Sequence, residues 1–156
     1  MSIELEYENH TKHLEDHEVL LADVITQTVA YAEPDLDPHT KLAVSFSIVD
    51  EKVIQELNKS LRHKDAVTDI LSIGEFDLRG AVKEHEGEDL FLGELIVCYD
   101  FIKESAIIGN VHFLHELSFI VSHGILHLMG YEHGEEMFAL QDSVSKNMII
   151  KYAIYE

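Results

Sequence analysis

Three histidines toward the end of the chain have the types and the spacing of a metal site. His127 lies four residues after His123, and His133 follows six residues later. On a helix, residues at i and i+4 lie on one face, so both imidazoles can reach the same ion. Gly130 can end that helix in a left-handed conformation. The turn that follows can bring His133 back as a third ligand, which predicts a three-histidine metal centre.

This ligand set is typical of a catalytic zinc site, because three protein ligands leave one coordination position open. Water at such an ion has a pKa of about 7, so hydroxide is available at neutral pH. We therefore predict one Zn²⁺ ion. Nickel and copper also accept imidazole ligands, and Ni²⁺ is a possible substitute.

The residues around the histidines favour a metal site over three unrelated histidines. Between about Val111 and Met129 the chain predicts a long, mostly apolar helix that His123 and His127 interrupt. Buried polar groups need partners, and a metal is one. Glu116 extends the same stripe two turns earlier. It is either an acceptor that orients a ligand histidine or an ordinary surface or capping carboxylate.

The spacing resembles the metzincin protease pattern H-E-x-x-H-x-x-G-x-x-H, with one difference. Gly124 stands where those proteases carry a glutamate general base. A protease of that type without its base should be badly impaired, so we expect a shared metal geometry and a different chemistry. Metal-bound hydroxide is the simplest general base, and His112, His115 and Glu116 are weaker candidates.

Hydrophobic patterning places the histidine helix in an α+β or mixed α/β fold. A sheet of about four strands is expected to pack with helices, and the 111–129 helix is expected to be buried. A helix separates the first two strands, which favours a parallel crossover between them. The expected strands are Ser2–Glu8, Leu42–Val49, Asp69–Ile73 and Leu92–Cys98. The other expected helices are Leu14–Ala32, Glu51–Leu61 capped by Asp50, one capped by Asp100, and Glu135–Tyr152. A polar loop is expected over Gly74–Asp89.

Size and composition are those of an ordinary folded domain. The chain has 156 residues, 46% hydrophobic and 26% charged, so we expect one domain over residues 1–156. Cys98 is the only cysteine, which excludes an internal disulfide and fits a reducing compartment. No apolar run approaches the roughly 20 residues that span a bilayer, and the acidic start does not resemble a signal peptide. We predict a cytoplasmic protein that makes no membrane contact.

Three stretches of the chain match, in order, the motifs of a known family. His123 to His133 reads HGILHLMGYEH, close to the pattern HGxLHLxGYDH. Leu57 to Ile73 is similar to LNxxYRxxDxPTDVLSF, and Leu92 to Val97 is similar to LGDIxI. Together they resemble the YbeY family of bacterial endoribonucleases, also called rRNA maturation factors.

The resemblance implies a zincin-like α+β metallohydrolase fold with a zinc-type ion on His123, His127 and His133. It implies single-strand-specific RNA cleavage in rRNA processing, notably at the 3′ end of 16S rRNA, and in ribosome quality control. It also places Arg62 in the active cleft, where a guanidinium can stabilise charge that builds on the phosphoryl oxygens. The implied partners are single-stranded rRNA, the small ribosomal subunit with its proteins, and an assembly GTPase.

The net charge limits how such a protein can bind RNA. Asp and Glu number 30 against 11 Lys and Arg, which gives a formal charge of −19. This field repels polyanions and argues against a broad basic footprint. Basic residues form one modest cluster, and weak binding to free RNA is therefore expected. The cluster is Lys59, Arg62, His63 and Lys64, with Lys41 and Lys52 earlier in the chain.

Two other functions stay open on the sequence alone. One is a metallohydrolase acting on peptides, against which Gly124 counts. The other is a non-catalytic ribosome-assembly factor whose metal only holds the fold. A fourth ligand from Cys98 or Glu116 would favour that second alternative, and an open fourth position speaks against it.

Overall fold

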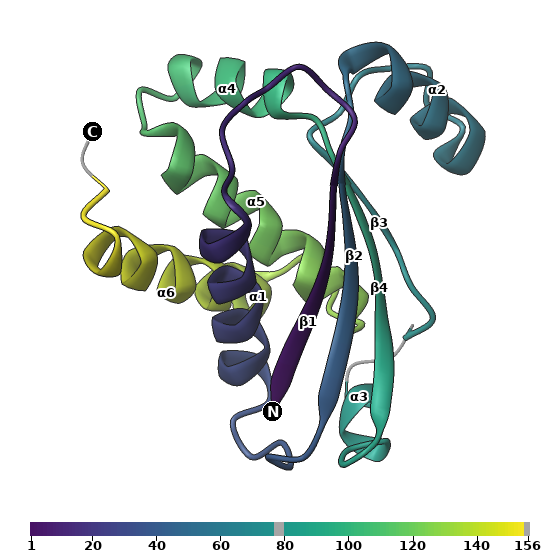
Figure 1. Ribbon diagram of the computed structural model, residues 1–156, viewed down its shortest axis with the longest axis vertical. Coiled ribbons are helices and arrows are strands. Elements are labelled where there is room, and N and C mark those ends of the chain that lie inside the picture. The colour runs from purple at the N-terminus through teal and green to yellow at the C-terminus, as the bar shows by residue number, and fades with distance from the viewer. Residues whose placement is uncertain (77–79, 155–156) are drawn as a thin grey trace.

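A computed structural model describes residues 1–76 and 80–154, and in this part of the chain four strands form one mixed sheet (Figure 1). The strands are β1 (Ser2–Asn9), β2 (Lys41–Ile48), β3 (Ile70–Ile73) and β4 (Asp89–Val97), in the order β1-β2-β4-β3. β1, β2 and β4 are parallel, and β3 pairs with β4 in the antiparallel sense as an edge strand. The predicted α+β class, the mixed sheet and the parallel β1–β2 crossover are confirmed.

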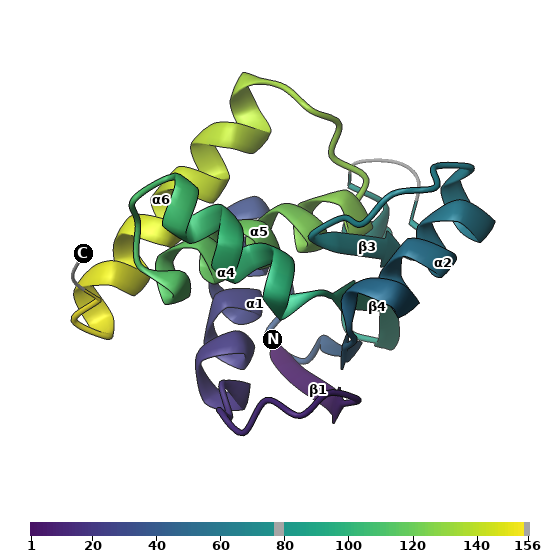
Figure 2. The same cartoon turned by 90° about the horizontal axis from the view of Figure 1, so that it is seen from above.

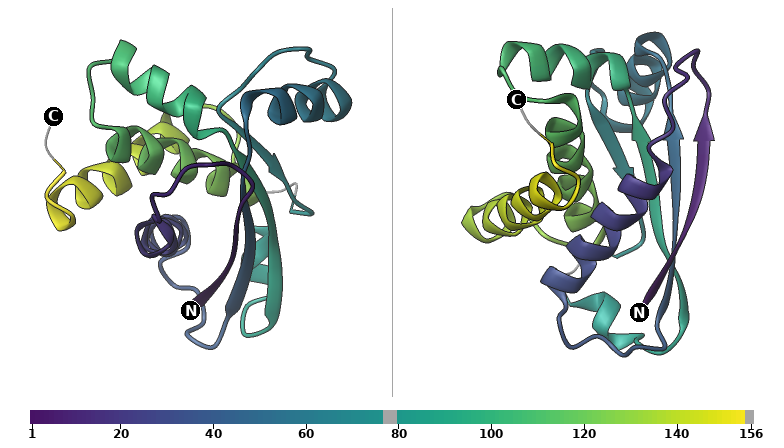
Figure 3. Two further views of the ribbon diagram at one scale, coloured as in Figure 1. Left: turned by 45° about the horizontal axis from the view of Figure 1, so that its top comes forward. Right: turned by 60° about the vertical axis from the view of Figure 1, so that its left-hand side comes forward.

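Helices cover one face of the sheet. α1 (Glu18–Ala32) and α5 (Phe113–Leu128) pack on that face, and α6 (Glu135–Lys151) packs on both of them (Figure 3). α4 (Tyr99–Ile108) packs on α5, and α3 (Ala81–Glu84) is a single turn before β4. α2 (Glu51–Arg62) lies apart from these, beside β3 and β4 (Figure 2). None of the helices in the described ranges is long and apolar enough to cross a membrane.

α5 is the central buried helix, as its apolar sequence predicts. Leu117, Val121 and Ile125 are fully buried on it, because α1, α4, α6 and the sheet surround it. Facing it, β2 buries every second side chain from Leu42 to Ile48, the alternation of a strand with one covered face. The helix begins at Phe113, where His112 caps it by accepting a hydrogen bond from the Leu114 backbone N–H.

Gly124 lets α5 approach the β3 edge of the sheet closely. A Cβ atom built on Gly124 would lie 2.7 Å from Cδ1 of Ile70 and 2.9 Å from Cδ2 of Leu95. It would also lie 3.1 Å from Oγ of Ser72. Any side chain at this position points into the sheet, so the glutamate of the metzincin pattern has no room here. The missing glutamate is therefore a consequence of packing.

Several element boundaries differ from the sequence predictions. α1 begins at Glu18 instead of Leu14, whose side chain is 95% exposed, because residues 10–17 form a loop. β4 begins at Asp89 and α3 lies within the expected loop, of which residues 77–79 are outside the described ranges. Asp50 does cap α2 by accepting from the Val53 N–H, at 3.0 Å.

Asp100 is not the residue that caps α4, contrary to the prediction. The capping position belongs to Cys98, and α4 begins at Tyr99. The Asp100 carboxylate lies 2.9 Å from Nε2 of His13 instead. This contact ties the 10–17 loop to the start of α4.

Replacing Gly124 by alanine is expected to destabilise the fold. The added methyl group overpacks the α5–sheet contact and costs about 1–3 kcal/mol. This cost exceeds the gain in helix propensity, which is at most about 1 kcal/mol. Urea unfolding of Gly124→Ala against wild type measures it. Gly134→Ala is the control, because a Cβ there meets nothing within 4 Å. Equal stability of Gly124→Ala and wild type would contradict the close approach.

Asp23 on α1 makes stability depend on pH. Burial alone would raise the pKa of Asp23, but hydrogen bonds from Lys151, Tyr152 and Gln27 outweigh burial and hold it below the usual 3.8. A lowered folded-state pKa stabilises the fold above the unfolded-state pKa, and this contribution disappears as the pH falls through the lower folded value. We expect Asp23→Asn to be less stable than wild type at neutral pH.

The difference between Asp23→Asn and wild type should shrink steadily below about pH 4. Thermal unfolding of both proteins across that range measures the difference, and the other titrating groups cancel between them. A difference that does not change with pH would refute the role of the Asp23 carboxylate.

Candidate metal centre

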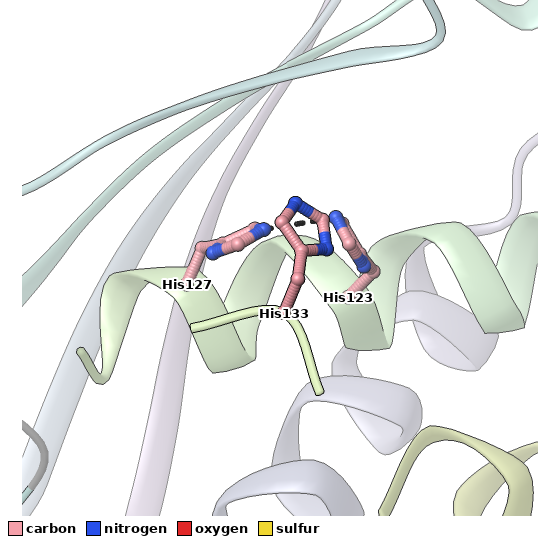
Figure 4. A group of neighbouring side chains, drawn as sticks. All are labelled: His123, His127 and His133. Atoms are coloured by element: carbon pink, nitrogen blue, oxygen red, sulfur yellow. Dashed lines mark hydrogen bonds between the residues drawn. The ribbon is translucent and has the colours of Figure 1, made fainter. Parts of the chain in front are cut away.

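The structure brings all three predicted histidines together above the end of α5 (Figure 4). His123 and His127 rise from one face of the helix, and His133 comes back toward them from the following loop. One nitrogen from each of the three imidazoles lies within 4.8 Å of the other two. The Nε2 atoms of His123 and His127 are 2.9 Å apart.

Gly130 makes the return of the chain possible, as predicted. Its φ of 86° lies in the left-handed region, which glycine adopts without a steric cost. The Tyr131 N–H donates to the Leu126 carbonyl at 3.0 Å, and the Gly130 N–H donates to the His127 carbonyl. These two hydrogen bonds end α5 and turn the chain toward His133.

Two acceptor oxygens orient the helix-borne imidazoles. Nδ1 of His127 lies 3.1 Å from the Tyr131 carbonyl oxygen, and Nδ1 of His123 lies 3.5 Å from Oε1 of Gln141. The Gln141 amide group also donates to the Phe119 carbonyl at 3.4 Å, which fixes its oxygen toward His123. Because an amide oxygen only accepts, these contacts assign the proton of each imidazole to Nδ1, and that assignment leaves a lone pair on each Nε2.

This arrangement fits a metal ion. Two lone pairs directed at each other over 2.9 Å repel unless a cation lies between them. Tetrahedral zinc with bonds of about 2.0–2.1 Å separates two nitrogens by about 3.3 Å, so a small opening of the histidine pair accommodates it. Burial lowers the pKa of both His123 and His127, and the neighbouring histidines add to this lowering. Both imidazoles are therefore neutral and able to coordinate at pH 7.

The three histidines lie in the wall of a cleft with two adjoining cavities. The first has a volume of about 230 Å³ and polar walls from α2, β3 and the loop between them, including Asn58, Lys64, Thr68 and Asp69. The second has a volume of about 400 Å³ and includes Gly74, Phe76 and Leu128. Arg62, Ser72, His127 and His133 line both cavities, so the candidate metal site lies where the two meet.

Arg62 stands in this shared wall. It is the last residue of α2, which ends because His63 adopts a left-handed conformation with φ 61°. Nη2 of Arg62 donates to the Ser72 carbonyl on the free edge of β3, at 2.9 Å. The remaining guanidinium N–H groups make no hydrogen bond with the described residues, so they are available to a substrate. The structure thus brings Arg62 together with the three histidines.

Other residues considered from the sequence lie elsewhere. His112, His115 and Glu116 are at the start of α5, and none of them lines either cavity. Cys98 is buried in a separate cluster with Ile54 and Leu71, and burial raises the pKa of its thiol. Among the described residues, the metal-binding group contains no fourth histidine, cysteine or carboxylate.

Gln141 is a residue at the candidate site that the sequence reasoning missed. It is a buried polar residue on α6, with 4% of its surface exposed. A signal for it exists in the sequence, since Met137, Val144 and Met148 lie on the same helical stripe and are all buried. A polar side chain inside an apolar stripe needs a partner, and here that partner is His123.

The fold and the centre define a class, a zincin-like α+β protein with a three-histidine site. Comparison with known proteins gives the family. The family profile described as "Endoribonuclease YbeY" matches residues 6–149. A curated relative named Endoribonuclease YbeY, from Macrococcus caseolyticus, is 39% identical over 142 residues, which cover 85% of this chain and 84% of the relative. One of the same name from Staphylococcus epidermidis is 36% identical over 135 residues, covering 78% and 83%.

A solved structure also resembles this chain in its fold. The solution structure of TM1509 from Thermotoga maritima matches with a TM-score of 0.61 and 25% identity, and covers 96% of this chain and 92% of that one. The chain therefore belongs to the YbeY endoribonuclease family, as the resemblance of its motifs predicted.

Removing the Gln141 amide should weaken metal binding without unfolding the protein. Partners that orient a metal-binding histidine contribute roughly 10–100-fold in affinity. We expect Gln141→Ala to bind Zn²⁺ that much more weakly in a chelator competition, and Gln141→Glu to restore binding because a carboxylate also accepts. Gln55→Ala, the same change on α2 outside the cleft, is the control. Unchanged affinity in Gln141→Ala would show that Gln141 does not orient His123.

Proposed function

We propose that residues 1–156 form one metal-dependent endoribonuclease domain that cuts single-stranded RNA during rRNA processing. Its setting is maturation of the 16S rRNA 3′ end and ribosome quality control in the cytoplasm. The observation that carries this proposal is the three-histidine group in one cleft with Arg62, in a chain of the endoribonuclease YbeY family. His123, His127 and His133 are the proposed metal ligands.

The proposed ion is Zn²⁺, with Ni²⁺ as a possible substitute. The chemistry that such an ion supplies when bound is Lewis acidity, which stabilises negative charge on phosphoryl oxygen and lowers the pKa of nearby water. Three ligands with no fourth among the described residues favour a reactive site over a purely structural one. This speaks against the non-catalytic assembly factor.

Arg62 is proposed to bind the phosphate that is cut. Its hydrogen bond to the Ser72 carbonyl holds the guanidinium in the wall between the two cavities. A planar guanidinium donates two parallel hydrogen bonds to phosphoryl oxygens, where negative charge grows as the phosphodiester reacts. Lysine at this position would keep the charge but lose that geometry.

The charge distribution suits a short RNA segment delivered by a partner. Of the basic cluster Lys59, Arg62, His63 and Lys64, only Arg62 and Lys64 line the cleft. The chain as a whole has a net charge of −19. Few neutralised phosphates give low affinity that falls further with salt. We therefore propose that the small ribosomal subunit with its proteins, or an assembly GTPase, holds the rRNA in place.

A peptide substrate is the weaker alternative. Zincin-type peptide hydrolysis uses a glutamate next to the first histidine as general base. Packing of Gly124 against Ile70 and Leu95 leaves no room for that side chain. No observation in the described chain favours a peptide over RNA.

Metal-loaded protein is expected to cut a single-stranded rRNA fragment and to leave the matching duplex intact. His127→Ala should abolish cutting through loss of metal. Arg62→Ala should slow it by roughly 10²–10³-fold, the effect of removing one group that stabilises the transition state. Arg62→Lys should recover only part of that loss. Gel analysis of end-labelled RNA measures each rate.

Lys59→Ala is the matched control, because Lys59 lies on the same helix, pairs with Asp65 and does not line the cleft. We expect its rate to stay within about threefold of wild type. The proposed activity would be refuted if verified metal-loaded protein cut neither free rRNA nor rRNA within small-subunit particles. Tight, sequence-independent binding to free RNA at physiological salt would refute the proposed need for a partner.

A further inference from the structure

A carboxylate that no motif assigned to a role lies in the cavity of the three histidines. Asp69 immediately precedes β3, and it lines the 230 Å³ cavity together with His123, His127 and His133. It is close enough to His123 for its charge to act on that imidazole. Asp69 is thus the one carboxylate in the described lining of the two cavities that meet at the metal site.

The structure holds one oxygen of Asp69 and leaves the other available. Oδ1 accepts hydrogen bonds from the Ile70 N–H at 2.7 Å and from Oγ1 of Thr68 at 3.3 Å. The Asp69 carbonyl accepts from the Cys98 N–H at 3.0 Å, which fixes the backbone to the end of β4. Oδ2 has no hydrogen-bond partner within the described ranges. A fixed carboxylate with one unoccupied oxygen can receive a proton from a group bound in the cavity.

Asp69 is near the metal site without being part of it. The group of side chains whose ligand atoms lie within 4.8 Å of one another contains the three histidines and excludes Asp69. No ion pair within 4.0 Å joins Asp69 to any of the described histidines. Asp69 therefore lines the same cavity as the three histidines without joining their group, and from that wall a carboxylate can act as a general base on a water molecule bound in the cavity.

Packing explains why this carboxylate comes from the sheet. In the metzincin pattern the base lies on the helix, next to the first histidine. Here that position is Gly124, and its missing side chain allows β3 to lie directly against α5. The same approach that excludes a base on the helix brings the start of β3, and with it Asp69, to the cavity. The carboxylate that metzincins carry on the helix is absent here, and the Asp69 carboxylate before β3 lies in the cavity instead.

We propose that Asp69 is the general base for RNA cleavage, an inference that rests on the proposed function. A water molecule between Asp69 and the scissile phosphate gives one proton to Oδ2 as its oxygen bonds to phosphorus. The bond from phosphorus to the leaving ribose oxygen breaks with its electron pair, and that oxygen takes a proton from solvent. Asp69 then releases its proton to solvent, so the enzyme is regenerated without a further reactant.

Asp69→Asn tests this role, because asparagine keeps the oxygen that accepts from Ile70 and removes the base. Asp65→Asn is the matched control: it makes the same charge change on the same loop, outside the cleft. Four quantities are measured for each protein: bound zinc per chain, affinity of the metal-free protein for the rRNA fragment, single-turnover cleavage rate against pH, and incorporation of ¹⁸O from labelled water.

We expect Asp69→Asn to bind zinc and RNA within about threefold of wild type and to cut RNA roughly 10²–10⁴-fold more slowly, the usual contribution of a general base. The fall in wild-type rate on the acidic side should be absent from the variant. Wild type should place one ¹⁸O atom in the phosphate product. Asp65→Asn should match wild type in all four measurements.

Other outcomes overturn the proposal, and each differs from failure of the proposed function. A rate within threefold of wild type, or loss of zinc from Asp69→Asn, removes Asp69 as the base while the nuclease stands. A cyclic phosphate product without ¹⁸O shows attack by a ribose hydroxyl and overturns the water step. If Asp69→Asn does not fold, Asp69→Ser, which also keeps an acceptor, replaces it. If wild type cuts no RNA, the proposed function itself fails.

Discussion

The close contact between α5 and the β3 edge of the sheet is the constraint on which the rest of the site depends. It exists because Gly124 has no side chain, so that Ile70, Ser72 and Leu95 lie where a Cβ would be. His123 and His127 lie to one side of Gly124 on α5, in the cavity that Ile70, Leu71 and Ser72 of β3 also line. The Ser72 carbonyl on the edge of β3 then anchors Arg62, which arrives from α2. Histidines, arginine and the Asp69 carboxylate therefore meet because one residue is small.

Neutral, oriented imidazoles are the second requirement of the site. The Tyr131 carbonyl and the Gln141 amide each fix one Nδ1–H, so both Nε2 lone pairs face the same point. Burial disfavours protonation of His123 and His127, and each histidine disfavours a charge on its neighbour. The energetic cost of holding lone pairs together without a cation becomes binding energy for a metal when one is present. The site is thus prepared for an ion by its surroundings as much as by its ligands.

Features that depend on neighbouring residues in the sequence could be predicted, whereas contacts between elements distant in the sequence could not. Spacing along one helix predicted the pairing of His123 with His127, and the glycine turn predicted the return of His133. The Asp50 cap and the alternation in β2 are equally local. Gln141 lies 18 residues from His123 along the chain and Asp69 lies 54 residues away, so only the packing of α6 and β3 on α5 reveals them. The apolar spacing predicted α1 correctly but not its start, because Leu14 lies in an exposed loop and the helix begins at Glu18.

The shape of the cleft favours a single-stranded RNA over a duplex. Arg62, His127 and His133 lie in the wall shared by two cavities, one polar and one with Phe76 and Leu128 in its lining. In the proposed function, a phosphate held at that wall would have one nucleotide on each side, with one of the two cavities next to each nucleotide. Unpaired nucleotides can splay apart in this way, whereas stacking and pairing hold them together in a duplex. The proposed selectivity for single strands would then come from the position of Arg62 and the proposed metal ligands at the junction, in a chain whose net negative charge gives RNA little general attraction.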